Sequence, residues 1–136
     1  MTEKQIKDLD YVRDKILFHT NIDVKNPESK IKNINARIIF SNIARIQYKE
    51  MSIKSIGNYL GKSHPSVSRY LRDFYLIQNY TNNYERYYYD VYKAILFEMN
   101  SEKLINIKKI SKDFVSNKIS KLKQALKEVA EALQIK

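Results

Sequence analysis

Residues 52–74 read SIKSIGNYLGKSHPSVSRYLRDF, and this stretch decides the fold. Ser52 is a favourable N-cap for a short helix over 53–60, whose apolar residues recur at helical spacing on one face. Gly61 follows directly, and glycine tolerates the left-handed conformation that closes many helices. The first half of the stretch therefore predicts a short amphipathic helix with both ends marked.

The second half of the stretch predicts another helix. Ser63 is a second N-cap, and Pro65 falls in the first helical turn, where its missing N–H costs little. Apolar residues continue at helical spacing, so we expect this helix at about residues 64–75. Two capped helices separated by Gly61 and Lys62 predict a helix-turn-helix unit.

Helical patterns also cover the flanking sequence. Thr2 to Gln5 form a capping box for a helix at about 3–19, and Pro27 favours a loop over 20–29. A second helix is expected to be capped by Asn33 or Asn35, to end near 48–51 and to turn four apolar residues inward, namely Ile39, Ile43, Ala44 and Ile46. A further helix is expected at about 83–99, with six inward candidates: Tyr84, Tyr87, Tyr88, Val91, Ile95 and Leu96. The predicted fold class is all-α.

The C-terminal region differs from the rest. Six apolar residues are spaced 4, 3, 4, 3 and 4 apart, namely Val115, Ile119, Leu122, Leu126, Val129 and Leu133. This is the a/d rhythm of a coiled-coil seam. The segment 104–110 is ambiguous and compatible with a partly extended conformation. We expect a helical domain over 1–99 and a basic helical tail over 100–136 that serves as an oligomerisation element.

Composition excludes several classes of protein. The chain has 136 residues, no cysteine and two histidines, so disulfides, thiolate zinc sites and histidine-rich metal cages are not expected. Two glycines do not suffice for a phosphate-cradling loop, and no catalytic triad or buried carboxylate pair is indicated. No stretch is apolar for long enough to span a bilayer, and mixed charges follow Met1 where a signal peptide would have an apolar core. We expect a cytoplasmic protein that is not an enzyme and has no cofactor, metal, small-molecule substrate or membrane attachment.

The charge distribution favours a polyanionic partner. The formal net charge is +10, and the excess lies in two segments. Residues 28–75 carry 9 basic and 3 acidic side chains, and residues 100–136 carry 9 and 4. A basic surface next to a helix-turn-helix predicts binding of double-stranded DNA.

Specific roles follow from the position of each side chain in this unit. The first turn of a recognition helix faces base edges, so the predicted base-reading residues are Ser63, His64, Ser66 and Arg69. Neighbouring cations can neutralise phosphates, and those predicted to do so are Lys62, Arg37, Arg45, Lys54 and Arg72.

Residues 36–74 resemble the C-terminal DNA-binding domain of the bacterial replication initiator DnaA. That family shows Ala-Arg at the start of a long helix, Ser-Leu-x-x-Ile-Gly, a Phe-Gly or Leu-Gly turn, and Asp-His-(Ser/Thr)-Thr-Val opening the recognition helix. The matching positions here are Ala36-Arg37, 52–57, Leu60-Gly61 and 63–67. The resemblance covers roughly residues 16–80 and implies DNA binding in replication or transcriptional control.

The chain departs from the family in four places. Ser63 stands where the family has aspartate, Pro65 where it has serine or threonine, and Asn35 where it has an arginine that reaches the minor groove. The family's basic loop is shortened to Lys30 and Lys32, which the resemblance implies as further phosphate contacts. The family's target sequence is therefore not carried over. The chain has no counterpart of the ATP-binding module of a full initiator and looks like a small stand-alone protein of bacteria or their phages.

Two functions remain open at this point. The first is sequence-specific binding of double-stranded DNA, in replication initiation or transcriptional regulation, without an ATPase of its own. The second is a helical structural or adaptor protein, for example in a phage particle or replication complex, that uses the same scaffold for protein docking and has only nonspecific DNA affinity. The tail seam can pair with a second copy or lie against its own domain. Self-association is favoured, because a homodimer would present two recognition helices to two half-sites.

Overall fold

A computed structural model describes residues 1–134 of the chain. Over this range the secondary structure consists of five helices, namely α1 (Glu3–Thr20), α2 (Ile31–Gln47), α3 (Ile53–Leu60), α4 (His64–Gln78) and α5 (Asn83–Gln134). The fold is therefore all-α, as the sequence predicts. The chain divides into two compact units, Met1–Phe97 and Glu98–Lys136, so the division falls inside α5.

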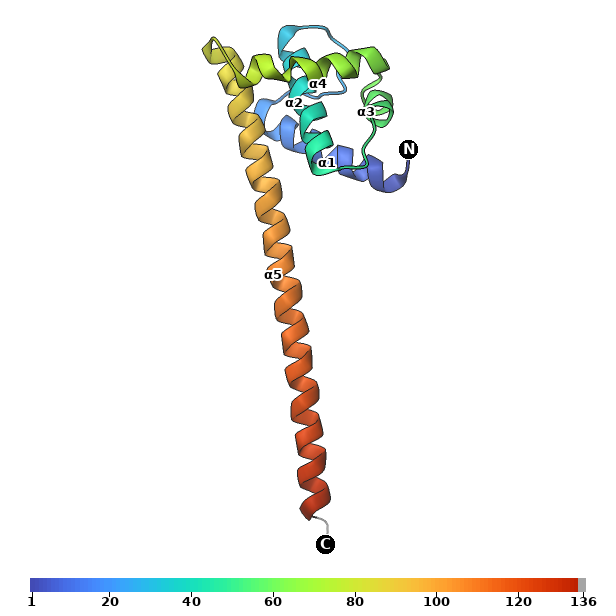
Figure 1. The fold of residues 1–136 in the computed structure, drawn as a ribbon, viewed down its shortest axis with the longest axis vertical. Coiled ribbons are helices and arrows are strands. Elements are labelled where there is room, and N and C mark those ends of the chain that lie inside the picture. The colour runs from blue at the N-terminus through green and yellow to red at the C-terminus, as the bar shows by residue number, and fades with distance from the viewer. Residues whose placement is uncertain (135–136) are drawn as a thin grey trace. The chain divides into compact units, whose positions relative to one another are not determined.

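Helix α2 is the centre of the first unit. Its buried positions run without interruption over 36–41, so its whole circumference is covered at this point. It packs against α1 on one side and against α4 on another, and Figure 1 shows α4 crossing it. The expectation for Ile46 was wrong, since this side chain near the end of α2 is 55% exposed.

The start of α2 also differs from the expectation. The N-cap is Lys30, which makes no side-chain capping hydrogen bond, so neither Asn33 nor Asn35 caps the helix. Asn33 lies inside the first turn, is buried, and its Oδ1 accepts no hydrogen bond from any described residue. The loop before the helix is held to α2 by Arg37, as described below.

Helix α1 is tied to the rest of the first unit by polar contacts. Its capping box is present, and Asn21 in the left-handed conformation ends it. The Arg13 guanidinium donates to both carboxylate oxygens of Asp23 at 2.9 and 2.6 Å. The Tyr59 hydroxyl of α3 donates to Asp10 at 2.5 Å, and burial raises the pKa of Tyr59. These contacts fix α1 against the 21–30 loop and α3.

The first turns of α5 complete the first unit. Tyr88, Val91 and Ile95 are buried as expected, whereas Tyr84 and Tyr87 remain almost half exposed. The buried face also includes Tyr92, whose ring lies 4.6 Å from that of Phe74 in α4. Phe74 is thus joined to an aromatic cluster that holds α4 against the start of α5.

The second unit consists of the remainder of α5. The segment 104–110 is helical throughout, so the partly extended alternative was wrong. All six seam residues are exposed, from 48% for Ile119 to 70% for Leu133. Among the described residues, no helix combines the length and the apolar character that crossing a bilayer requires.

Candidate nucleic-acid interface

The turn between α3 and α4 is tight. Gly61 takes the left-handed conformation, with φ +67°, and its N–H and that of Lys62 both point to the Gly57 carbonyl. A Cβ atom added to Gly57 would lie 2.7 Å from the backbone oxygen of Lys62, a distance that forces the chain to shift. Two glycines therefore allow α4 to begin directly beside the end of α3.

The first turn of α4 faces outward. Ser63 is the N-cap, as expected, and its Oγ accepts the Ser66 N–H at 3.3 Å. Ser63, His64 and Pro65 are exposed, and Ser66 is half-buried. The two serine hydroxyls lie 3.0 Å apart and hydrogen-bond to each other. His64 is consequently the side chain of this turn whose polar atoms are least engaged by the cap.

Two cations lie beside this turn. Arg69 is exposed on α4, one helical turn after Pro65. Lys62 is half-buried, and its ammonium group donates to the Pro27 carbonyl at 3.4 Å. Both side chains line a hollow of about 380 Å³ together with Ser29 and Ser66. The structure thus brings together Lys62, Ser66 and Arg69, which the sequence analysis had selected separately.

Arg37 is a correction to the predicted phosphate contacts. It is only 1% exposed, and its guanidinium points into the protein. Its Nε donates to the Tyr70 hydroxyl at 3.2 Å, Nη1 to the Asn26 carbonyl at 2.8 Å, and Nη2 to the Glu28 carbonyl at 3.0 Å. Arg37 therefore joins α2, α4 and the 21–30 loop, and its function in the fold is structural.

The other predicted phosphate contacts are on the surface, with different degrees of freedom. Lys54 and Lys32 are exposed. Lys30 lies 3.2 Å from the Glu28 carboxylate, and Arg72 lies 3.4 Å from that of Asp73; both basic side chains are more than 60% exposed. Such exposed ion pairs are weak, so a phosphate can take the place of the carboxylate.

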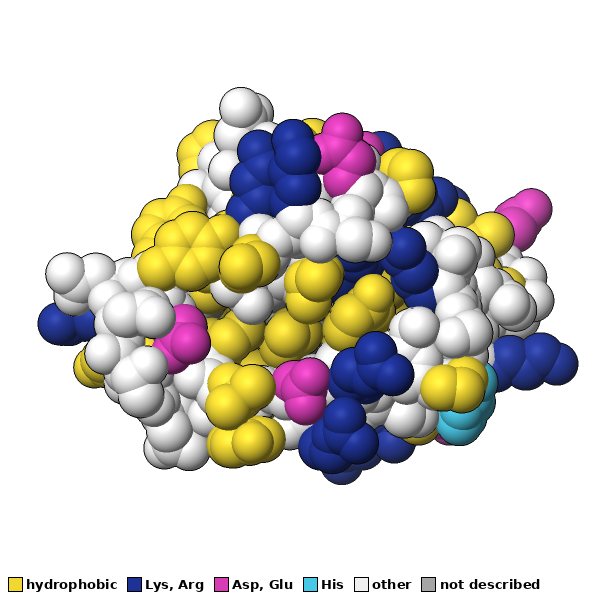
Figure 2. Space-filling view, turned by 90° about the horizontal axis from the view of Figure 1, so that it is seen from above, with side chains coloured by type: hydrophobic (Ala, Val, Ile, Leu, Met, Phe, Trp, Pro, Cys, Tyr) yellow, Lys and Arg dark blue, Asp and Glu magenta, His cyan; other side chains and the backbone are white. Residues whose placement is uncertain are grey.

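Arg45 combines exposure with a structural contact. Its Nη1 donates to the Met51 carbonyl at 2.8 Å, which closes the connection between α2 and α3. The residue as a whole is exposed. Figure 2 shows Lys and Arg side chains at several places on one face, beside exposed apolar side chains and with acidic ones next to some of them.

Sequence reasoning missed the contribution of the 21–30 loop. Asn26 forms a turn in which its Oδ1 accepts the Glu28 N–H at 3.0 Å, and this turn presents the Pro27 carbonyl to Lys62. Ser29 then lines the hollow beside α4. The Asn26-Pro27 pair was the available signal, because this dipeptide often starts a turn, but nothing in it indicated which helix the turn would touch.

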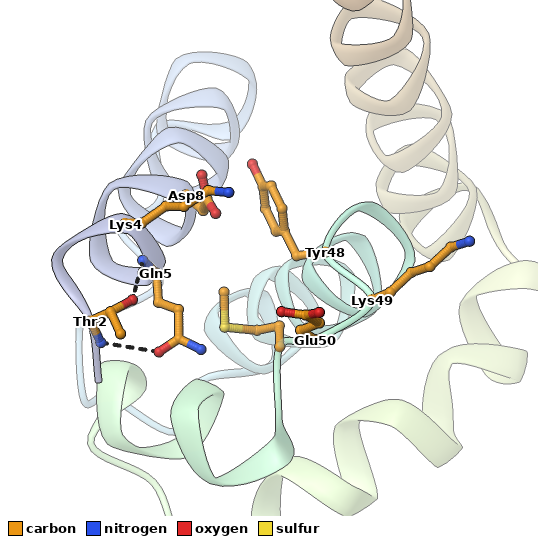
Figure 3. A pocket seen from close by; sticks show the side chains of 8 residues that line it. Thr2, Lys4, Gln5, Asp8, Tyr48, Lys49 and Glu50 are labelled. Atoms are coloured by element: carbon orange, nitrogen blue, oxygen red, sulfur yellow. Dashed lines mark hydrogen bonds between the residues drawn. The ribbon is translucent and has the colours of Figure 1, made fainter.

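A second hollow, of about 340 Å³, lies between the start of α1 and the α2–α3 connection (Figure 3). Tyr48 points into it toward Asp8, and burial together with the nearby Asp8 carboxylate raises the pKa of Tyr48 to about 12. Its charged lining residues are mixed in sign, with Lys4 and Lys49 beside Asp8 and Glu50. This hollow therefore has no net charge to attract a polyanion, and we do not include it in the interface.

Comparison with known proteins gave no relative. No protein-family model, no curated protein and no solved structure matches this chain. The geometry of the first unit and the chemistry of its surface are therefore the basis of the functional proposal.

Proposed function

We propose that this protein binds double-stranded DNA in a sequence-specific manner, through a helix-turn-helix of the DnaA C-terminal type formed by α3 and α4. The observation that carries the proposal is the outward-facing first turn of α4, where His64 is exposed and where Lys62 and Arg69 line one hollow. A recognition helix contacts base edges through its N-terminal residues, so this turn must be unobstructed. The resemblance of residues 36–74 to the initiator domain supports a role in replication initiation or transcriptional regulation.

The proposed contacts divide into two groups. Arg69 suits bidentate pairing with guanine, and His64 can pair with a base edge through either ring nitrogen. The Ser63 and Ser66 hydroxyls can add weaker contacts, although each already takes part in the cap. The cations that hold the phosphate backbone in this proposal are Lys62, Arg72, Lys54, Arg45, Lys30 and Lys32, and Arg37 is left out because it is buried.

The test begins with selection of bound fragments from random duplex DNA, followed by titrations with three variants. His64→Ala and Arg69→Ala should each cost about 1–3 kcal/mol on the preferred sequence and relax specificity at one position. Lys62→Ala should weaken binding to all sequences and reduce the slope of log K against log salt by about 1. Lys7→Ala, which removes the same charge from an exposed position of α1, is the matched control and should leave binding unchanged. Unaltered affinity in all three interface variants would refute the assignment.

One observation favours the adaptor alternative. Phe18 is 83% exposed near the end of α1, and in the adaptor alternative it would be an aromatic anchor for the docked protein. The adaptor alternative predicts that DNA affinity is weak, indifferent to sequence and lost at moderate salt. A specific complex should instead bind its preferred site about 10³–10⁷ times more tightly than other DNA. The same fragment selection therefore separates the two functions.

A further inference from the structure

Among residues 1–134, nothing covers the apolar seam of the second unit. Its six residues are each at least 48% exposed, although they are valine, isoleucine and leucine. We infer that residues 115–133 pair with the same residues of a second copy, and that the two helices run antiparallel. The pairing itself does not depend on DNA binding, whereas its consequence for DNA rests on the proposed function.

The area of such an interface is sufficient for a specific dimer. Burial of one aliphatic side chain stabilises by about 1.5–3 kcal/mol, at about 25 cal/mol per Å² of apolar surface. Each buried side chain therefore removes roughly 60–120 Å² of apolar surface from water. Two copies bring twelve seam side chains together, so the seam alone buries on the order of 1,000 Å², the lower limit for a specific interface. Ala125, Ala130 and Ala132 flank the seam and leave room for close approach of the helices.

Side-chain branching does not favour a parallel dimer. Parallel dimers favour β-branched residues at a and leucine at d. Here the a positions are Ile119, Leu126 and Leu133, and the d positions are Val115, Leu122 and Val129, so four of the six positions reverse that preference. In an antiparallel pair each layer joins an a residue to a d residue of the second copy. Ile119 then faces Val129, Leu122 faces Leu126, and Val115 faces Leu133.

Charge favours the same orientation. Residues 115–123 carry three lysines and no acidic residue, whereas residues 125–133 carry one lysine and two glutamates. Parallel pairing would place the two lysine-bearing halves side by side, with Lys118 next to Lys123 of the second copy. Antiparallel pairing places each of these halves beside a half with net charge −1, and Lys118 then lies beside Ala132, which its aliphatic stem can cover.

Antiparallel pairing determines the distance between the two Glu98 residues, at which the second units of the two chains begin. Glu98 precedes the midpoint of the seam, residue 124, by 26 residues of continuous helix. At 1.5 Å per residue, the two Glu98 residues of a dimer would be roughly 80 Å apart. Adjacent half-sites on DNA lie only about 34 Å apart. Because antiparallel helices lead to the two first units from opposite ends of the pair, the dimer would hold two separate DNA sites or two duplexes together.

The orientation can be tested without DNA, because the natural chain has no cysteine. Lys118→Cys and Ala132→Cys chains, mixed and treated with a short bifunctional maleimide, should cross-link to each other far more than either does to itself. The reason is that an antiparallel pair separates identical positions 118 by about 18 Å along the axis. Preferential cross-linking of Lys118→Cys to itself would overturn the orientation. Sedimentation of the full chain as a monomer at roughly 100 μM would overturn the pairing.

Variants of the seam test the consequence for DNA. Leu126→Glu should raise the dissociation constant of the dimer by at least about 100-fold. Ser120→Glu adds the same charge on the far side of the helix and should leave it unchanged. The natural chain should retain a fluorescent duplex on beads that carry a second duplex, and Leu126→Glu should lose this capture while still binding each duplex alone. Cross-linking without any DNA binding would uphold the pairing and refute the proposed function, whereas tight binding without capture would overturn the inference that the dimer joins two sites.

Discussion

Replacement of Arg37 by lysine distinguishes a structural residue from a phosphate contact. Lysine keeps the positive charge, so a phosphate contact would survive the change largely intact. A structural role would not, because the three acceptors of Arg37 lie in different directions and belong to Tyr70, Asn26 and Glu28. A single ammonium group on a flexible stem cannot reproduce the planar fork of the guanidinium.

The expected magnitude follows from the acceptors that lose their donor. If the lysine ammonium reaches one of the three acceptors, the other two, which are buried or half-buried oxygens, are left without a donor. Each such loss costs about 1–3 kcal/mol where water does not replace the donor. Water can reach the two carbonyls in part, since the loop residues Asn26 and Glu28 are exposed. Two such losses would together cost about 2–6 kcal/mol, and partial hydration favours the lower part of this range. We therefore expect Arg37→Lys to lower the free energy of unfolding by about 2–3 kcal/mol.

Urea unfolding followed by circular dichroism measures this difference, with the midpoint and slope compared between variants. Arg69→Lys is the matched control, because Arg69 is exposed on α4, and it should change stability by less than about 0.5 kcal/mol. An equally small effect for Arg37→Lys would show that the three hydrogen bonds do not stabilise the first unit and would refute the reasoning.

Two further predictions concern the turn and the α1 contact. Gly57→Ala should destabilise the protein by about 1–3 kcal/mol in the same urea assay, because the added Cβ would lie 2.7 Å from the Lys62 carbonyl oxygen. A neutral or stabilising effect, which helix propensity alone predicts, would contradict this close approach. Lys54→Ala, at an exposed position of α3, is the control. The hydrogen bond from Arg13 lowers the pKa of Asp23, so this pair stabilises the folded state above the unfolded pKa of about 3.9 and stops doing so as pH falls through the lower folded value. Between pH 6 and pH 3 the natural protein should therefore lose more stability than the Asp23→Asn variant. The difference should be less than about 1 kcal/mol, because the Arg13 and Asp23 side chains are both about a third exposed. Parallel pH profiles of the two proteins would show that the pair contributes nothing to stability.

The sequence predicted best where one residue type has one local function. Ser52, Gly61 and Ser63 each cap or end a helix at the position expected, because capping depends on a few neighbouring backbone groups. The prediction for α4 ended at residue 75, three residues before the helix does. Phe74 and Ile77 continue the packed face there, and their contacts come from other helices, which local patterns do not describe.

The misplacement of Arg37 has a physical reason. An arginine next to a helix-turn-helix is usually exposed, and the acceptors that bury this one come from residues 26, 28 and 70, far from it in sequence. One signal was present, since Arg37 stands inside an apolar run with Ala36 before it and Ile38, Ile39 and Phe40 after it. Such a run predicts a helix that is covered on all sides, and a charge within it must find partners in the interior.

The central position of α2 makes the first unit a single cooperative structure. Helix α2 contacts α1 and α4, and Arg37 holds the preceding loop to it, so α1, α4 and this loop cannot separate while α2 keeps these contacts. The backbone amides of α2 should accordingly exchange with deuterium only when the whole unit unfolds, at the slowest rates in the molecule. A mutation anywhere in this helix would then act on the folded population of the entire first unit rather than on one of its edges.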